Sequence, residues 1–245
     1  MSLEAIVFII IGAIFGGFIN GLAGFGTALF ALGWWLQVMP PPAAVALAIA
    51  MSLISGVQGV WLVRRSIEPK RLIRFVLPAL IGIPIGVLLL DHIDAALLKV
   101  IVATFLLAYG AFFAFRRNLP DLKRPTPFLD RAVGFLGGFF GAVAGLSGAL
   151  PTVWLSLRPW PKTERRALLQ PFNMVVLGLA ALRLAIKGIY DSNLLLAIAI
   201  ATPATLLSAQ AGFLIFKRMN DADFRRLLIF LMLASGVVLL TRSLF

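Results

Sequence analysis

The chain has 245 residues, of which 61% are hydrophobic and only 13% are charged, and its mean hydropathy is +1.01. This composition excludes a soluble globular domain and indicates an integral membrane protein. The formal net charge of +12 resides in short loops between apolar runs, so we interpret it as a topology signal rather than as a surface for nucleic acid. The chain has no cysteine and a single histidine, His92, so no metal ion and no cofactor is expected.

Several apolar runs are long enough to cross a bilayer core as helices, which takes ~20 residues. In chain order they cover about 5–38, 43–63, 72–90, 95–115, 132–157, 167–187, 192–216 and 226–242. Turn and breaker residues separate them, and no connecting loop is long enough to fold alone. The sequence therefore predicts an all-α polytopic membrane protein with about eight membrane segments. The apolar N-terminus lacks the basic flank of a signal peptide, so we expect it to be retained.

The positive charges predict which loops share one side of the membrane. Eighteen of the 22 Lys and Arg residues lie in four short segments, at 64–74, 116–131, 158–166 and 217–226. Basic loops mark the cytoplasmic side, and all four lie there only if the run 132–157 leaves that side and returns to it. We therefore predict that this fifth run is a pair of re-entrant half-helices bent within Gly141–Gly148, and that the first run is broken in the same way. One straight helix that violates the charge rule is the alternative.

The two halves of the chain repeat each other weakly. Setting Gly17 on Gly138 also aligns Phe18 with Phe139, Ala23 with Ala144, Gly24 with Gly145, Ala28 with Ala149, and Leu29 with Leu150. We predict an N-terminal repeat at 1–118, a cytoplasmic linker at 119–127 and a C-terminal repeat at 128–245. Because the fifth run returns, equivalent segments cross in opposite directions, as in many secondary transporters. Chance similarity between helices rich in small residues is the alternative.

Glycine-rich sequence interrupts the first and fifth runs at matching positions. Irregular backbone at membrane depth is tolerated only where it is buried in protein or lines a water-filled cavity. A half-helix that begins there offers free N–H groups and a positive dipole end, which favour an anion. Hydroxyl groups can add further donors, while close helix packing by small residues is the alternative role. The candidate substrate-binding residues in these breaks are Gly24, Phe25, Gly26, Thr27, Gly145, Ser147 and Gly148.

Two amides lie on either side of Pro171 in the sixth run. We expect Gln170 and Asn173 to face the second break as further substrate-binding residues, with Ser52, the repeat counterpart of Asn173, as a weaker candidate. Amides in membrane helices also bind neighbouring helices, so that role stays open. No Asp or Glu lies centrally in any apolar run, so a carboxylate proton relay is not expected. An anion needs none, because each negative charge that leaves a negative interior gains about 2.3 kcal/mol per 100 mV.

The second half also carries an extended pattern of motifs. It consists of GLSGALPT at 145–152, Trp154, WPK at 160–162, Arg166-Ala167 and QPFN at 170–173. This pattern resembles the TauE/SafE sulfite exporter family of bacterial membrane proteins, and the similarity spans the whole chain. Phe25-Gly26-Thr27 stands where the first-half motif of that family carries a run of glycines. The resemblance implies transport of sulfite, sulfonates or related sulfur anions, usually outward, across the bacterial inner membrane.

Together these observations predict a secondary transporter and not an enzyme. It is expected to lie in the lipid bilayer, to bind a small anion between its two halves, and to move it by alternating access. Association into a homo-oligomer is left open, and no nucleic-acid partner is expected. An anion channel is one alternative, and a non-transporting membrane subunit that anchors a partner enzyme is another.

Overall fold

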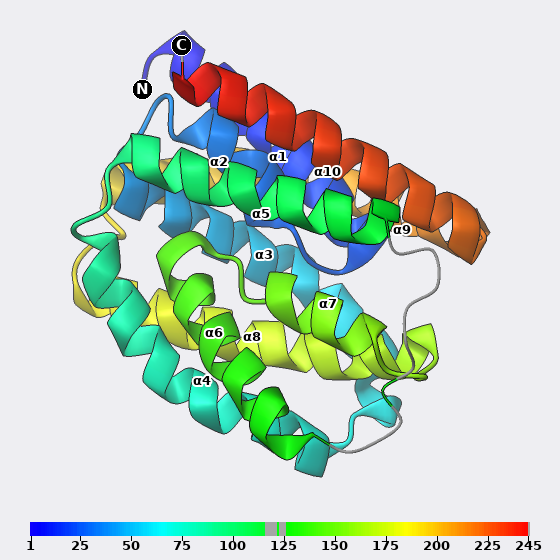
Figure 1. Ribbon diagram of the computed structural model, residues 1–245. Helices are drawn as coiled ribbons and strands as arrows, with labels where there is room; N and C mark the ends of the chain where they lie inside the picture. Colours follow the sequence, from blue (N-terminus) through cyan, green and yellow to red (C-terminus); the bar gives the residue numbers. More distant parts are fainter. Residues whose placement is uncertain (116–121, 123–125, 245) are drawn as a thin grey trace.

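The computed structural model describes residues 1–115, 122 and 126–244, and within these ranges it contains helices and no strands (Figure 1). This confirms the all-α prediction. The elements in chain order are α1 (Leu3–Ala23), α2 (Thr27–Trp35), α3 (Pro41–Val63), the short 3-10 helix η1 (Arg64–Ser66), α4 (Pro69–Leu90), α5 (Ala95–Phe115), α6 (Pro127–Ala144), α7 (Ala149–Ser156), α8 (Lys162–Ile186), α9 (Ser192–Arg218) and α10 (Asp221–Leu244).

Helix starts follow local sequence signals. Pro41, Pro69 and Pro127 occupy the first turn of α3, α4 and α6, where the missing N–H of proline costs no helical hydrogen bond. Asp191 caps α9, because its side chain accepts a hydrogen bond from the backbone N–H of Leu194 at 2.8 Å. Such caps satisfy donors that the helix leaves unpaired. The boundaries therefore follow from residues that the sequence places at each loop.

Six helices in the described part of the chain are long and apolar enough to cross a membrane, namely α1, α3, α4, α5, α8 and α9. Large apolar side chains cover their outward faces; on α4, for example, Leu77 is 58% exposed, Ile81 63% and Leu88 62%. An apolar exterior of this kind suits lipid and not water. The molecule is thus a multi-pass membrane protein. The count of eight membrane segments stays a prediction, because α6 and α10 are not among the six.

Both glycine-rich runs are broken at the predicted positions. The helix α1 stops at Gly24, with φ +80°, and α2 starts after Gly26, with φ +99°. In the same way α6 stops at Gly145, with φ +68°, and α7 starts after Gly148. Positive φ values are readily adopted only by glycine, which explains why the helices stop there. The run 132–157 is therefore not one straight helix.

Each second helix runs back along the first. On α2 the indole Nε1 of Trp35 donates a hydrogen bond to the carbonyl oxygen of Ile9, near the start of α1, at 3.1 Å. On α7 the indole Nε1 of Trp154 donates to Oδ1 of Asp130, near the start of α6, at 2.7 Å. Contacts between the end of one helix and the start of the other require antiparallel packing. The pairs α1–α2 and α6–α7 are thus helical hairpins, and their glycine turns lie inside the protein.

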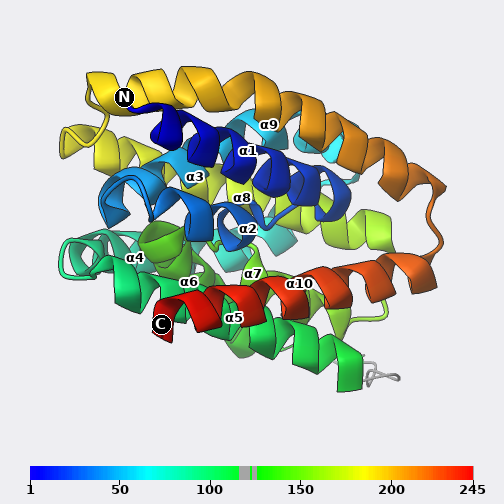
Figure 2. The same cartoon turned by 90° about the horizontal axis from the view of Figure 1, so that it is seen from above.

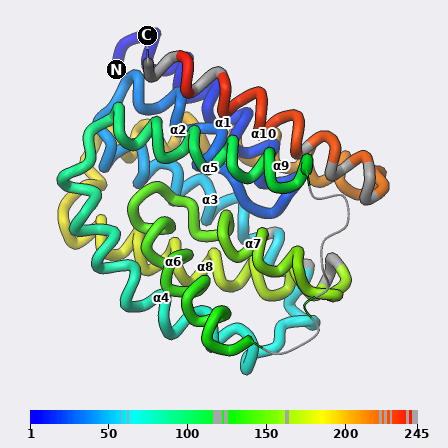
Figure 3. The backbone as a smooth tube through the Cα atoms, viewed as in Figure 1, coloured from blue at the N-terminus to red at the C-terminus, as the bar shows by residue number. Residues whose placement is uncertain are grey.

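The helices pack in pairs that join the two halves of the chain. α1 lies along α9, α4 along α6 and α5 along α10, while α3 and α8 pack together in the centre. Figure 2 shows α1 beside α9, and Figure 3 follows α5 beside α10 and α4 beside α6. If the repeat is applied, α1 is equivalent to α6 and α9 to α4. The pair α1–α9 therefore exchanges with the pair α6–α4 when the halves are exchanged.

Glycines inside helices bring these pairs together. A Cβ atom on Gly138 of α6 would lie 2.4 Å from the carbonyl oxygen of Ala79 on α4. At the equivalent place in the other pair, a Cβ atom on Gly17 of α1 would lie 2.6 Å from the carbonyl oxygen of Thr205 on α9. Neither position has room for a side chain, so the backbones are in direct contact. Packing explains glycines such as Gly17 and Gly138, where two helix backbones meet, whereas the glycines in the breaks need another reason.

We expect Gly138→Ala to destabilise the protein by about 1–3 kcal/mol, because the added methyl group overpacks the contact with α4. Thermal unfolding of the purified protein in detergent measures the effect. The matched control is Gly178→Ala on α8, where a Cβ atom would meet no atom within 4 Å. That change should be neutral or stabilising by up to ~1 kcal/mol, because alanine favours helix over glycine. Equal losses in both variants would contradict the packing argument.

Candidate functional site

A cavity lies where the two helix breaks meet α3 and α8. Eight of the nine substrate-binding residues predicted from the sequence line it, and they come from both halves of the chain: Gly24, Phe25, Gly26, Gly145, Ser147, Gly148, Gln170 and Asn173. The remaining lining residues are Asn20, Leu29, Ser52, Gly56, Leu146, Ala149, Met174 and Leu177. The predicted residues thus gather at one place.

Thr27 is the one predicted residue that does not line the cavity. It is the first residue of α2 and only 1% exposed. Its side chain turns toward α1, where a Cβ atom on Gly16 would lie 3.0 Å from the Thr27 methyl carbon Cγ2. The Thr27 hydroxyl is buried and has no hydrogen-bond partner among the described residues. The packing of α2 against α1 therefore removes this hydroxyl from the cavity.

The two breaks come into direct contact at the cavity. A Cβ atom on Gly148 would lie 3.0 Å from Cβ of Phe25 and 2.9 Å from Nδ2 of Asn173. A Cβ atom on Gly145 would lie 3.1 Å from Cβ of Ala28. The first turns of α2 and α7 therefore face the same space, although more than a hundred residues separate them in the sequence.

The N-terminal ends of α2 and α7 give the cavity a positive potential. Neither helix has a side-chain cap, since Gly26 and Gly148 occupy the cap positions. Leu29 and Ala149, in the first turns of these helices, line the cavity. The first N–H groups of α2 and that of Leu150 on α7 have no backbone partner among the described residues, whereas Ala149 donates to the carbonyl oxygen of Leu146 at 3.3 Å and Pro151 has no N–H. Such N–H groups and the positive ends of the two helix dipoles favour an anion. No Asp, Glu, Lys or Arg is among the residues that line this space, so no carboxylate opposes that effect.

Polar side chains cross the cavity and join its walls. The Ser147 hydroxyl donates to Oδ1 of Asn173 at 2.9 Å, which links the second break to α8. The Gln170 amide donates from Nε2 to the carbonyl oxygen of Gly24 at 3.1 Å, which links α8 to the first break. The structure records no hydrogen bond from Nδ2 of Asn173 to any described residue. That amide nitrogen keeps its donors for a bound molecule.

Two further polar residues line the cavity, namely Asn20, which was not among the selected substrate-binding residues, and Ser52, which was the weaker candidate. Asn20 lies one helical turn before the first break and donates to the hydroxyl of Ser55 on α3. Ser52 lines the cavity, but its hydroxyl donates back to the carbonyl oxygen of Ala48 at 2.7 Å. The available signal was the spacing of four residues between Asn20 and Gly24, which places both on one face of α1.

The cavity is narrow in this conformation. The cavity volume that the centre of a water molecule can occupy is about 20 Å³. On the same measure about 10–15 Å³ suffices for one water molecule. An anion with three or four oxygen atoms requires more space. A ligand of that size does not fit the cavity in this conformation.

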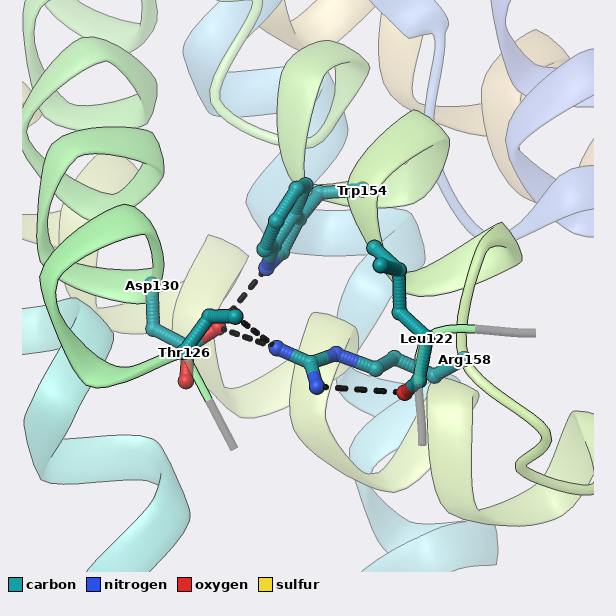
Figure 4. Close-up of polar contacts among 5 residues, drawn as sticks. All are labelled: Leu122, Thr126, Asp130, Trp154 and Arg158. Atoms are coloured by element: carbon teal, nitrogen blue, oxygen red, sulfur yellow. Dashed lines mark hydrogen bonds and ion pairs between the residues drawn. The ribbon is translucent and has the colours of Figure 1, made fainter. Parts of the chain in front are cut away.

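A buried polar cluster joins the start of α6 to the end of α7, opposite the glycine turn of this hairpin (Figure 4). The guanidinium of Arg158 lies 3.1 Å from Oδ1 of Asp130, and these side chains are only 6% and 12% exposed. Trp154 donates to the same carboxylate oxygen at 2.7 Å. Arg158 also donates to the hydroxyl of Thr126 and, at 3.3 Å, to the carbonyl oxygen of Leu122. The cluster fixes where α7 lies and thereby the position of Gly145–Gly148.

Comparison with known proteins identifies one matching protein family, and the matched range includes the residues of the site. The model of the protein family described as sulfite exporter TauE/SafE matches residues 9–239, a range that includes both helix breaks and every residue that lines the cavity. No curated protein and no solved structure matches the chain significantly. The match covers nearly the whole chain and agrees with the motifs noted in the sequence, so the chain belongs to the sulfite exporter TauE/SafE family of membrane transporters.

Proposed function

We propose that the protein is a secondary transporter that carries a small sulfur-containing anion, such as sulfite or a sulfonate, outward across the bacterial inner membrane by alternating access. The observation that carries this proposal is the cavity itself. Two uncapped helix N-termini, one from each half of the chain, face a space whose lining, as far as the structure describes the chain, contains no charged side chain. The family of the chain supports the sulfur chemistry of the substrate.

The donors around the cavity suit an oxyanion. The oxygens of sulfite and of sulfonates only accept hydrogen bonds when these anions are ionised, so each requires a donor. The amide Nδ2 of Asn173 and the backbone N–H groups at the starts of α2 and α7 supply such donors. The Ser147 hydroxyl, which now donates to Asn173, can rotate toward the anion once the cavity widens. In this proposal Asn173 and the two helix starts hold the substrate.

The arrangement of helices supports an inverted repeat with two re-entrant hairpins. The glycine turns of α1–α2 and α6–α7 lie inside the protein, and the pairs α1–α9 and α6–α4 exchange under the repeat. With each hairpin counted as one segment that returns to its own side, eight segments place the four basic segments together. In such folds the substrate lies near the midplane, between the repeats.

Alternating access requires some contacts to break while others persist. α4 and α8 are joined at both ends, by Arg71 and Glu164 at 3.2 Å and by Lys187 and Asp91. We expect these two helices to move as one body. The Gln170 to Gly24 hydrogen bond joins this body to the first break. Because that bond crosses the side of the cavity, its opening widens the space for the anion.

Flux into proteoliposomes tests the proposal. We expect saturable sulfite flux that shows counterflow and that unlabelled sulfonate or thiosulfate reduces by competition. Asn173→Ala should lower kcat/KM at least about tenfold, because it removes hydrogen bonds to a charged ligand worth about 1.5–3 kcal/mol. Gly178→Ala, on the same helix, should leave the flux unchanged. Flux without saturation would indicate a channel, and no flux of any anion would favour a non-transporting subunit.

Cysteine labelling tests the predicted topology, since the native chain contains no cysteine. Pro159→Cys lies in an exposed loop between α7 and α8, and His92→Cys lies in an exposed turn between α4 and α5. An impermeant maleimide added to intact cells should label His92→Cys and leave Pro159→Cys unlabelled until the membrane is permeabilised. Labelling of Pro159→Cys from outside would contradict both the re-entrant hairpin and the inverted repeat.

A further inference from the structure

Arg166 is a cation close to the cavity, and no charged partner faces it among the residues that the structure describes. It lies on α8, one turn before Gln170 and two turns before Asn173. Residues separated by four and seven positions share one face of a helix. The three polar side chains therefore form a stripe along α8 that leads from its N-terminal end to the lining of the cavity.

The guanidinium of Arg166 directly contacts the first helix break. A Cβ atom on Gly24 would lie 3.4 Å from Nε and 3.5 Å from Nη2 of Arg166. The same Cβ atom would lie 2.6 Å from Nε2 of Gln170. Gly24 and Gln170 both line the cavity, so Arg166 lies directly behind the Gln170 to Gly24 hydrogen bond in its wall.

The surroundings of Arg166 do not satisfy its charge. Its Nε atom is buried without a hydrogen-bond partner, and no hydrogen bond or ion pair joins its guanidinium to another described residue. Its neighbours on α9 are aromatic, with the ring centroids of Phe216 and Phe213 at 5.0 Å and 5.9 Å from Cζ. Aromatic faces stabilise a cation weakly and leave its N–H donors unused. A partly buried guanidinium with free donors suits an oxyanion, which it can bind through two parallel hydrogen bonds.

We propose that Arg166 forms a second anion-recognition position, next to the cavity, that binds the sulfite or sulfonate group as it passes between Asn173 and the basic end of α8. This inference rests on the proposed function and names a further residue for it. When Gln170 releases Gly24, the space between the Asn173 amide and the Arg166 guanidinium becomes continuous. The anion can then move from the N-terminal ends of α2 and α7 to the guanidinium of Arg166, along a path that no carboxylate of the cavity lining faces.

Substitution at Arg166 tests the role of its charge. In proteoliposomes Arg166→Gln should raise the KM for sulfite about tenfold or more, since it removes charge-assisted hydrogen bonds to the anion. Arg166→Lys, which keeps the charge, should recover part of that loss. Arg131→Gln is the matched control, because it removes one exposed positive charge from the start of α6, and its KM should be that of the wild type. Equal KM values for Arg166→Gln and wild type would overturn the inference and leave the proposed function intact.

Chemical rescue provides a second readout on this cysteine-free chain. Arg166→Cys should lose flux, alkylation by 2-bromoethylamine should restore a positive charge and part of the flux, and alkylation by iodoacetamide should not. Equal flux after both reagents would overturn the inference, and circular dichroism and gel filtration of the variant check its fold.

Protection from alkylation measures anion binding without transport, in a chain that keeps Arg166. Ser52→Cys places a thiol in the lining of the cavity, and we expect ethanesulfonate, which does not react with thiol reagents, to slow its alkylation at least threefold and to leave that of Pro159→Cys unchanged. Adding Arg166→Gln should remove most of this protection, and dependence on the soluble anion also separates this ligand from a lipid phosphate. Protection that depends on Arg166, with no wild-type flux, would refute the proposed function alone, whereas equal protection with and without Arg166→Gln, or none in either chain, would overturn the role of Arg166.

Discussion

Asp130→Ala should lower the free energy of unfolding by about 3–5 kcal/mol, because it leaves the charge of Arg158 buried without the carboxylate that faces it. The two side chains are 6% and 12% exposed, so water screens their interaction little. The indole N–H of Trp154 loses its acceptor in the same variant. Thermal unfolding in detergent should show a fall in Tm of roughly 6–20 °C for a chain of this size.

Two comparisons isolate the origin of this effect. Asp130→Asn keeps an oxygen acceptor for Trp154 and removes only the charge, so it should cost less than Asp130→Ala. Asp223→Ala removes the carboxylate of an exposed pair, in which Arg226 lies 3.8 Å away and the side chains are 55% and 83% exposed. Exposed pairs contribute about 0–1 kcal/mol. If the losses at Asp130 and Asp223 were equal, the cluster would not be what holds the hairpin closed.

The helix breaks were predictable because two independent signals agreed on them. Glycine clusters marked Gly24 and Gly145 as places where a helix can stop, and the basic loops required a returning fifth run. The structure has positive φ at both glycines. Eight of nine candidate residues then line the cavity, because a helix break determines locally which residues surround it. Thr27 lies outside the cavity lining because its orientation depends on how α2 packs against α1, which no local pattern reveals.

The remaining features depend on contacts that are distant in the sequence. Arg158 and Asp130 were interpreted only as parts of basic loops, and nothing in their spacing indicated a buried pair. The pairing of α1 with α9 and of α4 with α6 likewise depends on close contact between helix backbones at glycines. Hydrophobic patterning does not predict these partners, because in a membrane protein an apolar residue can face either lipid or another helix. Arg166 followed the charge pattern of its loop in the sequence, and only its contact with Gly24 at the first helix break distinguishes it from the neighbouring basic residues.

Gly148→Ala should abolish most transport and leave the fold intact. The backbone of Gly148 has φ −87°, which alanine adopts without strain. The added methyl group would lie 2.9 Å from Nδ2 of Asn173 and 3.0 Å from Cβ of Phe25. It therefore displaces the Asn173 amide from its hydrogen bond with Ser147 and fills space that holds about one water molecule. We expect kcat/KM for sulfite to fall about 10- to 100-fold, the value of one or two hydrogen bonds to an anion.

Gly145→Ala gives the contrast that makes this result specific. Gly145 has φ +68°, a conformation that costs an L-residue roughly 1–2 kcal/mol. Gly145→Ala should therefore lower Tm through backbone strain, whereas Gly148→Ala should cost only about 0.5–1.5 kcal/mol, the value of the Ser147 to Asn173 hydrogen bond that it displaces. Flux and thermal unfolding measured on both variants separate the two causes. Normal flux in Gly148→Ala would mean that the anion does not pass between the helix breaks, since a methyl group at that position would lie against both Phe25 and Asn173.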